Sequence, residues 1–399
     1  MFGFAVLTAV MTAPGQTIGV SVFIDHFIDD LSLSRSTVAL CYGIGTVAGS
    51  WSLPLIGRRI DQHGARASMT VIAVLFSIAI AAMAGVQGVV TLTLGFIGIR
   101  LLGQGALSLV STVAVAHWFD QLRGLVIGTK MTVVSMLMTL APFGLNALIG
   151  GIGWRTTWLV AALIVAVVVT PVAWFGIIDR PEDVGQIPDG RPFITTARMQ
   201  QDTRRGASRS EALRTRSFWV LTSGVASTSM LYTAVSFHQI SLLEEAGLTS
   251  SEAAAMFLPQ IIGSAIAGVT FGLLSDRLPG RVIIPASMTL LATSLFLASI
   301  AETMAVVVVY AIMLGMAGGA NASLSGTLLP RWYGTDHLGS IQGVLTTASV
   351  VGSAIGPVVL AVMEQSLDSF QDANRILLFL PVLVGLQAMT LRSQLGRVA

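Results

Sequence analysis

The sequence predicts an all-α polytopic membrane protein with twelve transmembrane helices in two pseudo-symmetric six-helix halves. The prediction rests on composition, on twelve long apolar runs and on an internal repeat. Of the 399 residues, 54% are hydrophobic and only 11% are charged, whereas soluble domains carry about 25% charged residues. This composition excludes a water-soluble globule, a disordered chain and a nucleic-acid-binding protein. The 22 basic and 20 acidic residues nearly cancel, so the charge balance indicates no polyanionic partner.

Twelve apolar runs are long enough to cross a bilayer, whose hydrocarbon core needs about 20 residues per helix. They lie near 2–24, 36–57, 67–87, 91–115, 123–148, 155–177, 217–242, 253–274, 282–300, 304–329, 339–363 and 374–391. The first run is too long for a signal peptide and no small-residue cleavage site follows it, so we expect a retained span.

The arginines predict the orientation of these spans. Seventeen lie in the loops after even-numbered spans, in the central loop or in the C-terminal tail, and only three lie in the opposite loops. Cytoplasmic loops carry the excess of basic residues. We therefore expect both termini in the cytoplasm.

The polar segment 178–216 divides the chain into an N-terminal half, 1–177, and a C-terminal half, 217–399. It contains three prolines and eight arginines. We interpret it as a cytoplasmic linker. Its arginines are typical of a solvated tether, although they could also bind anionic lipid headgroups.

The two halves repeat at an offset of 215 residues. Gly, Asp and Arg of one cytoplasmic loop return at this offset in the other half, and the landmarks of the fourth and fifth spans return as well. The matched positions are Gly57 and Gly272, Asp61 and Asp276, Arg66 and Arg281, Gly103 and Gly318, Gly124 and Gly339, and Pro142 and Pro357. Such a parallel duplication is typical of transporters that bind substrate near the membrane midplane.

The loop after the second span has the pattern Gly-x-x-x-Asp-x-x-Gly-x-Arg, from Gly57 to Arg66. Its glycine permits close helix packing, and its aspartate is suited to helix N-terminal amides and nearby arginines. We predict that Asp61, Arg66, Asp276 and Arg281 form cytoplasmic gating latches. The alternative is a loop-capping salt bridge without a gating role.

These motifs resemble the major facilitator superfamily over essentially the whole chain. The segment Arg100-Leu101-Leu102-Gly103-Gln104-Gly105 resembles its fourth-helix motif. Three further pieces resemble the bacterial monocarboxylate porter and oxalate/formate antiporter group: Pro14–Thr17 with Ser21–Phe23, Trp118–Gly124, and Arg331–Gly339. The resemblance implies transport of small organic anions, with protons or by exchange, and a location in the bacterial inner membrane.

Two cations fall inside predicted spans, Arg100 and Lys130, the only lysine, and no acid lies in the middle of any span. Intramembrane charges are costly and usually functional. An anionic substrate would compensate them, and Arg100 offers a bidentate fork to a carboxylate. The alternatives are a structural role for Arg100, with carbonyl and water partners, and snorkelling of Lys130 to the cytoplasmic face.

Neutral polar side chains in other spans complete the predicted substrate site. We expect the following residues to line the cavity: Gln16, Tyr232, Gln239, Gln260 and Asn321. His238 and Asp25 are candidates for proton coupling, because imidazole titrates near neutral pH and Asp25 is the acid nearest the cavity. An interfacial histidine and a helix-end carboxylate are the alternatives. Tyr42 is a candidate outer gate or a packing aromatic.

The motifs predict a secondary transporter rather than an enzyme. There is no Gly-x-x-x-x-Gly-Lys-Ser/Thr loop, no His/Cys cluster with metal spacing and no Ser/His/Asp arrangement. We therefore expect no cofactor and no metal. The predicted function is rocker-switch transport of a small organic anion, a monocarboxylate, by a monomer in the bilayer, with possible proton coupling. The alternatives are a proton-coupled exporter of amphipathic compounds such as drugs and a non-transporting membrane sensor.

Overall fold

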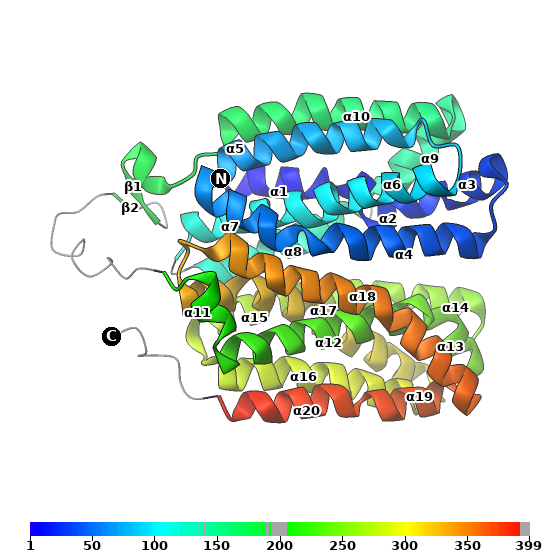
Figure 1. The fold of residues 1–399 in the computed structure, drawn as a ribbon. Helices are drawn as coiled ribbons and strands as arrows, with labels where there is room; N and C mark the ends of the chain where they lie inside the picture. The colour runs from blue at the N-terminus through cyan, green and yellow to red at the C-terminus, as the bar shows by residue number, and fades with distance from the viewer. Residues whose placement is uncertain (121, 139, 189–190, 193–205, 392–399) are drawn as a thin grey trace. The chain divides into compact units, whose positions relative to one another are not determined.

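A computed structural model describes residues 1–120, 122–138, 140–188, 191–192 and 206–391 (Figure 1). Within the predicted linker 178–216, residues 189–190 and 193–205 lie outside the described part, and the tail 392–399 does too. The described chain is almost entirely helical. Its one two-stranded sheet pairs β1 (Gln186–Ile187) antiparallel to β2 (Arg191–Pro192).

Helices occupy all six predicted spans of the first half. In chain order they are α1 (Phe2–Val10), α2 (Thr17–Val20), α3 (Ile24–Leu31), α4 (Arg35–Trp51), α5 (Leu53–Met83), α6 (Val89–Ile99), α7 (Ser108–Trp118), α8 (Arg123–Met138), α9 (Ala141–Ile152) and α10 (Trp154–Pro171). A π-helical segment, Arg100–Leu107, joins α6 to α7, and another, Val172–Gly176, follows α10.

Helices also occupy the six predicted spans of the second half. They are α11 (Arg209–Leu213), α12 (Arg216–Phe237), α13 (Gln239–Glu245), α14 (Ser250–Ala255), α15 (Phe257–Arg277), α16 (Gly280–Ala298), α17 (Met304–Tyr333), α18 (Leu338–Leu367), α19 (Phe370–Leu377) and α20 (Phe379–Met389).

Within the described residues, nine helical stretches are long and apolar enough to span a membrane. The three remaining predicted spans fall short for local reasons. The first is broken around Pro14-Gly15, because proline cannot continue the hydrogen-bonding ladder. The second, α4, has 17 residues. The seventh, α12, has 22 residues, and eight of these are serine or threonine.

Polar caps and glycines set several helix ends. The Ser34 and Thr303 side chains accept bonds from backbone amides at the starts of α4 and α17, as good N-caps do. Inside α5, Gly64 has φ 82° and interrupts the helical conformation between the second and third spans. The Asp179 carboxylate then accepts a 2.8 Å bond from the Arg66 amide, at the point where the helix resumes.

The described residues form two compact units by their internal contacts. Unit 1 comprises those within Met1–Asp120, Val133–Thr203 and Thr335–Thr347. Unit 2 comprises those within Gln121–Thr132, Arg204–Gly334 and Ala348–Ala399. The first turns of α8 and α18 therefore pack in the unit made mainly by the other half of the sequence. The division at 177 and 217 stays a prediction from the sequence.

Candidate substrate and latch sites

Arg100 lies in a buried cage of neutral acceptors in unit 1. Its side chain is 6% exposed. Nε donates to Thr46 Oγ1 at 2.9 Å, and Nη1 donates to Gly15 O at 3.2 Å and to Thr17 Oγ1 at 3.4 Å. The guanidinium carbon lies 4.7 Å from the centre of the Tyr42 ring, within the range of a cation–π contact.

The backbone around this cage is shaped by glycines. A Cβ at Gly15 would lie 2.4 Å from Ile99 O and 3.2 Å from the Gly103 Cα. Only the absence of a side chain lets the break in the first span approach the fourth helix this closely. The π-helical turns that begin at Arg100 add to the irregularity, and such turns occur frequently at functional sites.

No carboxylate bonds to Arg100 among the described residues. Its partners there are hydroxyl groups, a backbone carbonyl and an aromatic face. Neutral acceptors satisfy donors but do not cancel the charge, so a buried cation in such a cage favours an incoming anion. Tyr42 also bonds Thr17 Oγ1 at 2.7 Å, so Arg100, Tyr42 and Thr17 form one network.

The internal repeat is broken at this cage. At the offset of 215 residues, Arg100 becomes Gly315, Thr46 becomes Ile261 and Tyr42 becomes Phe257. A Cβ at Gly315 would lie 2.0 Å from Gln260 O, so the second half uses the position for close packing of α17 on α15. The polar groups around Arg100 are therefore not required by the fold itself.

Lys130 lies on α8 in unit 2 and is 1% exposed. Its helix packs tightly nearby, because a Cβ at Gly128 would lie 2.2 Å from Gly268 O. This burial contradicts the alternative in which Lys130 snorkels to the cytoplasmic face. At the repeat offset the residue is Leu345, also buried.

Asn321 and Tyr232 lie beside a seam of hydroxyl groups between α12 and α18 in unit 2. Ser229 Oγ bonds Ser349 Oγ at 2.6 Å, and Asn321 Nδ2 donates to Ser229 Oγ at 3.4 Å. Tyr232 packs where a Cβ at Gly318 would approach its ring to 2.8 Å. All four side chains are partly exposed, and Asn321 and the two serines are hydrogen-bonded to one another.

Gln239 and Gln260 bond to each other in the core of unit 2. Gln260 Nε2 donates to Gln239 Oε1, and Tyr310 Oη donates to the same oxygen at 3.4 Å. Gln239 has no exposed surface and Gln260 is 3% exposed. The sequence predicted that both line a cavity, whereas the structure buries them as a pair beside the apolar cluster of α13, α16 and α17.

The remaining predicted residues lie in separate places. Gln16 is partly exposed next to the Arg100 cage and donates from Nε2 to Thr12 Oγ1 at 3.0 Å. His238 lies at the break between α12 and α13 and contacts Pro357 O through Nε2 at 3.0 Å. Asp25 is exposed in the first turn of α3.

The Asp61 carboxylate binds the first turn of α18 within unit 1. Its carboxylate accepts bonds from the Gly339 amide at 2.6 Å and the Ser340 amide at 2.9 Å. These amides have no intrahelical acceptor, and the helix dipole places partial positive charge there. A Cβ at Gly57 would lie 1.9 Å from Gly339 O, so the glycine of the motif permits this contact.

Asp276 makes the equivalent contact within unit 2. Its Oδ1 accepts a 3.0 Å bond from the Gly124 amide, in the first turn of α8. Gly272 lies against this turn, since its Cβ would be 2.3 Å from Gly124 O. All three residues are those of the first latch displaced by 215 positions. The contact between each aspartate and helix amides matches the expectation from the motif.

The two motif arginines lie away from these carboxylates. The Arg66 guanidinium stacks 4.8 Å from the Trp174 ring centre, and Arg281 is exposed at the start of α16. Instead, Arg331 donates to Ser275 O and to Leu278 O at the end of α15. The roles of Arg331, Thr46 and Asp179 were not predictable from the sequence, because their partners are distant in the chain.

Comparison with known proteins identifies the family. The family model of the Major Facilitator Superfamily matches residues 4–264 and 238–391. The chain belongs to the Major Facilitator Superfamily. It is therefore a multi-pass membrane transporter of that superfamily, whose members carry small molecules, often with protons, and are not enzymes. No curated protein gave a significant sequence match.

Solved superfamily structures share the fold. The human organic anion transporter MFSD10 (TETRAN) aligns with a TM-score of 0.69 and 14% identity, over 97% of this chain and 99% of that one. The fucose:proton symporter FucP of E. coli aligns with a TM-score of 0.69 and 15% identity, over 97% of each chain. Together with the family match, these similarities confirm the predicted all-α major facilitator fold.

Proposed function

We propose that this superfamily transporter moves a small organic anion, with a monocarboxylate as cargo, by rocker-switch alternating access. The Arg100 cage carries the proposal. It holds a buried guanidinium with neutral partners only, among the described residues, and it has no counterpart in the second half of the chain. A purely architectural arginine would not need to break the repeat. MFSD10 shares the fold and is an organic anion transporter, which is consistent with this cargo class.

In this proposal the Arg100 guanidinium binds the carboxylate, and Tyr42 gates it. A carboxylate that approaches the guanidinium must displace the Tyr42 ring or the Thr17 hydroxyl, which now occupy its face and one donor. Charge-assisted bonds to a carboxylate are stronger than those to hydroxyls, so the exchange is favourable. Lys130 supplies a second buried positive charge.

The neutral residues take different roles. Gln16, Tyr232 and Asn321 are partly exposed and suited to contact the cargo directly. The buried pair Gln239 and Gln260 is suited to hold α13 against α15.

The titratable residues take the coupling and gating roles. His238 or Asp25 would carry a coupled proton. Asp61 and Asp276 would release α18 and α8 when the cytoplasmic side opens. We further propose a monomer in the bacterial cytoplasmic membrane, with both termini cytoplasmic.

Uptake into proteoliposomes tests the proposal. A panel of radiolabelled monocarboxylates is offered with and without an inward proton gradient. We expect accumulation of at least one anion, loss of its binding in Arg100→Gln, and partial recovery in Arg100→Lys, which keeps the charge but not the fork. Tyr42→Phe, which keeps the aromatic face, should retain binding. If no anion is bound or moved, the proposal is wrong, and proton-coupled efflux of drugs or other amphipathic compounds becomes the next activity to measure.

A further inference from the structure

The arginine of the sixth span in the first half joins three separate segments at the outer end of unit 1. Arg155 Nη2 forms a 2.7 Å ion pair with Asp30 Oδ2, at the end of α3. Its Nη1 donates to Ala84 O at 2.7 Å and Val86 O at 2.9 Å, in the connection between α5 and α6. The start of α10 is thereby attached to both neighbours.

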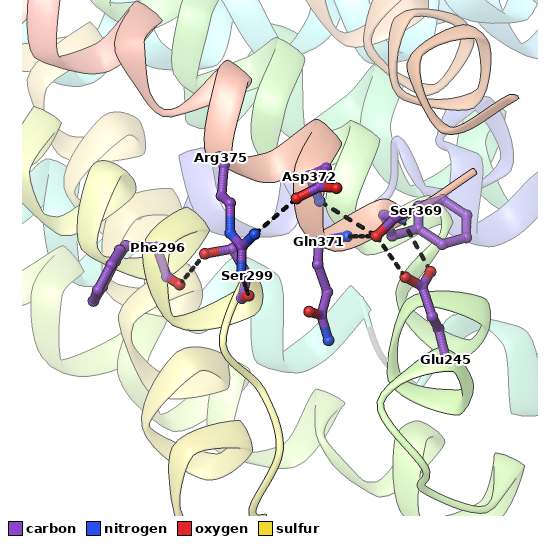
Figure 2. Close-up of polar contacts among 8 residues, drawn as sticks. Glu245, Phe296, Ser299, Ser369, Gln371, Asp372 and Arg375 are labelled. Carbon is purple, nitrogen blue, oxygen red and sulfur yellow. Dashed lines mark hydrogen bonds and ion pairs between the residues drawn. The ribbon is translucent and has the colours of Figure 1, made fainter. Parts of the chain in front are cut away.

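The second half has an equivalent arrangement (Figure 2). Glu245, at the end of α13, accepts bonds from the Ser369 hydroxyl at 2.8 Å and the Phe370 amide at 3.0 Å. One turn later Arg375 donates to Ser299 O at 3.3 Å, in the connection between α16 and α17. The start of α19 is thus attached to the end of α13 and to this connection.

The two arrangements follow the repeat closely. Asp30 and Glu245 are 215 residues apart, and so are Ala84 and Ser299. Arg155 itself corresponds to Phe370, whose amide Glu245 holds. In both halves a carboxylate at the end of the first span and a carbonyl after the third span hold the start of the sixth. We call each arrangement an outer tie.

The ties use most of the arginines that the predicted outer loops contain. Only three arginines lie in the predicted outer loops, and two of them, Arg155 and Arg375, make the ties. An isolated exposed ion pair contributes little to stability, but each tie also satisfies backbone carbonyls or amides at helix ends. Such bonds link segments that the short outer loops do not connect directly.

The ties differ from the cytoplasmic latches in what they join. Each latch joins an aspartate from one half of the sequence to a fifth-span helix from the other half. Each tie joins segments of a single half. Alternating access must change contacts between the halves but can preserve those within one. We infer that the outer ties stay closed through the transport cycle and that Asp30, Arg155, Glu245 and Arg375 are positioning residues, which keep each half intact while the latches open.

Hydrogen–deuterium exchange of the full-length protein in liposomes tests this inference without any cargo. In Asp61→Asn the charge that holds α18 is lost, so exchange at the Gly339 and Ser340 amides should accelerate. The Phe370 amide, held by Glu245, should exchange at its original rate. If it accelerates together with the latch amides, the tie opens with the latch and the inference is wrong.

A second measurement examines the positioning role. Glu245→Ala should accelerate exchange at Phe370, and it should lower the maximal uptake rate several-fold while leaving the apparent affinity for the panel anion unchanged. The matched control is Glu302→Ala, at an exposed acid of the same outer surface. An unaltered maximal rate in Glu245→Ala, with Phe370 exchange accelerated, would overturn the role. The inference rests on the proposed function only in this second measurement. If the unaltered protein shows no uptake, the proposed function is rejected. The exchange measurement in Asp61→Asn then decides by itself whether the ties stay closed.

Discussion

Gly57→Ala should open the first proposed latch, the contact of Asp61 with the first turn of α18. The added Cβ would lie 1.9 Å from Gly339 O and 2.8 Å from the Ser340 nitrogen, both of them backbone atoms. An ordinary carbon–oxygen contact needs about 3.3 Å, so α5 and the first turn of α18 must separate by roughly 1.4 Å. The bonds from Gly339 and Ser340 to Asp61, now 2.6 and 2.9 Å, would then lengthen beyond normal hydrogen-bonding distance.

The cost follows from those two bonds. Hydrogen bonds to a charged group contribute about 1.5–3 kcal/mol each, and Asp61 is only partly buried, so the lower value applies. The helix propensity of alanine does not enter, because α5 is helical whether the latch is open or closed. The change is therefore about 3 kcal/mol, which raises the population with an open latch roughly 150-fold.

Thiol labelling measures this population. Ser340 is 4% exposed, so in a Cys41→Ser background the variant Ser340→Cys should react with a maleimide only when the latch opens. Gly57→Ala should accelerate the reaction by more than an order of magnitude. The matched control is Gly150→Ala on α9, where an added Cβ meets nothing within 4 Å. Equal labelling rates in the two variants would refute the steric reasoning.

Three further variants test other contacts. Thr46→Val removes the acceptor of Arg100 Nε without changing side-chain volume. We expect a loss of about 2 kcal/mol in stability, seen as a lower melting temperature. An unchanged melting temperature would show that water replaces the hydroxyl. Lys130→Met replaces a buried cation with an apolar chain of similar length, so anion affinity should fall about tenfold or more. Unchanged affinity would remove Lys130 from the site. Arg331→Gln should lower the melting temperature because Ser275 O and Leu278 O lose their donor. The control Arg281→Gln, at an exposed residue, should leave the melting temperature unchanged. Equal effects of the two variants would contradict the role of Arg331 as donor to these carbonyls.

Much of the fold was predictable because membrane insertion imposes constraints that a single sequence records. Apolar length places the spans, and the structure has helices in all twelve runs. The repeat predicted that Asp61 and Asp276 would have equivalent surroundings, and each does bond to helix-start amides.

The partners of individual side chains were less predictable. The motif suggested arginines beside Asp61, yet Arg66 stacks on Trp174 and Asp61 bonds to backbone amides 278 residues away. Gln239 and Gln260 were expected to line a cavity, but they are buried and bond to each other. A polar residue in an apolar helix does not reveal whether cargo, water or another side chain satisfies it.

The sequence by itself determined the class of protein, its number of apolar runs and the duplication, because these depend on composition, segment length and spacing. It also identified Arg100 and Lys130 as cations within spans whose middle sections contain no acid. Only the tertiary structure decided that Arg100 sits among hydroxyls, that Lys130 is buried and that Arg155 joins Asp30 to the Ala84 carbonyl. Those outcomes depend on close approaches between distant backbone segments, which glycine permits but spacing along the chain does not specify.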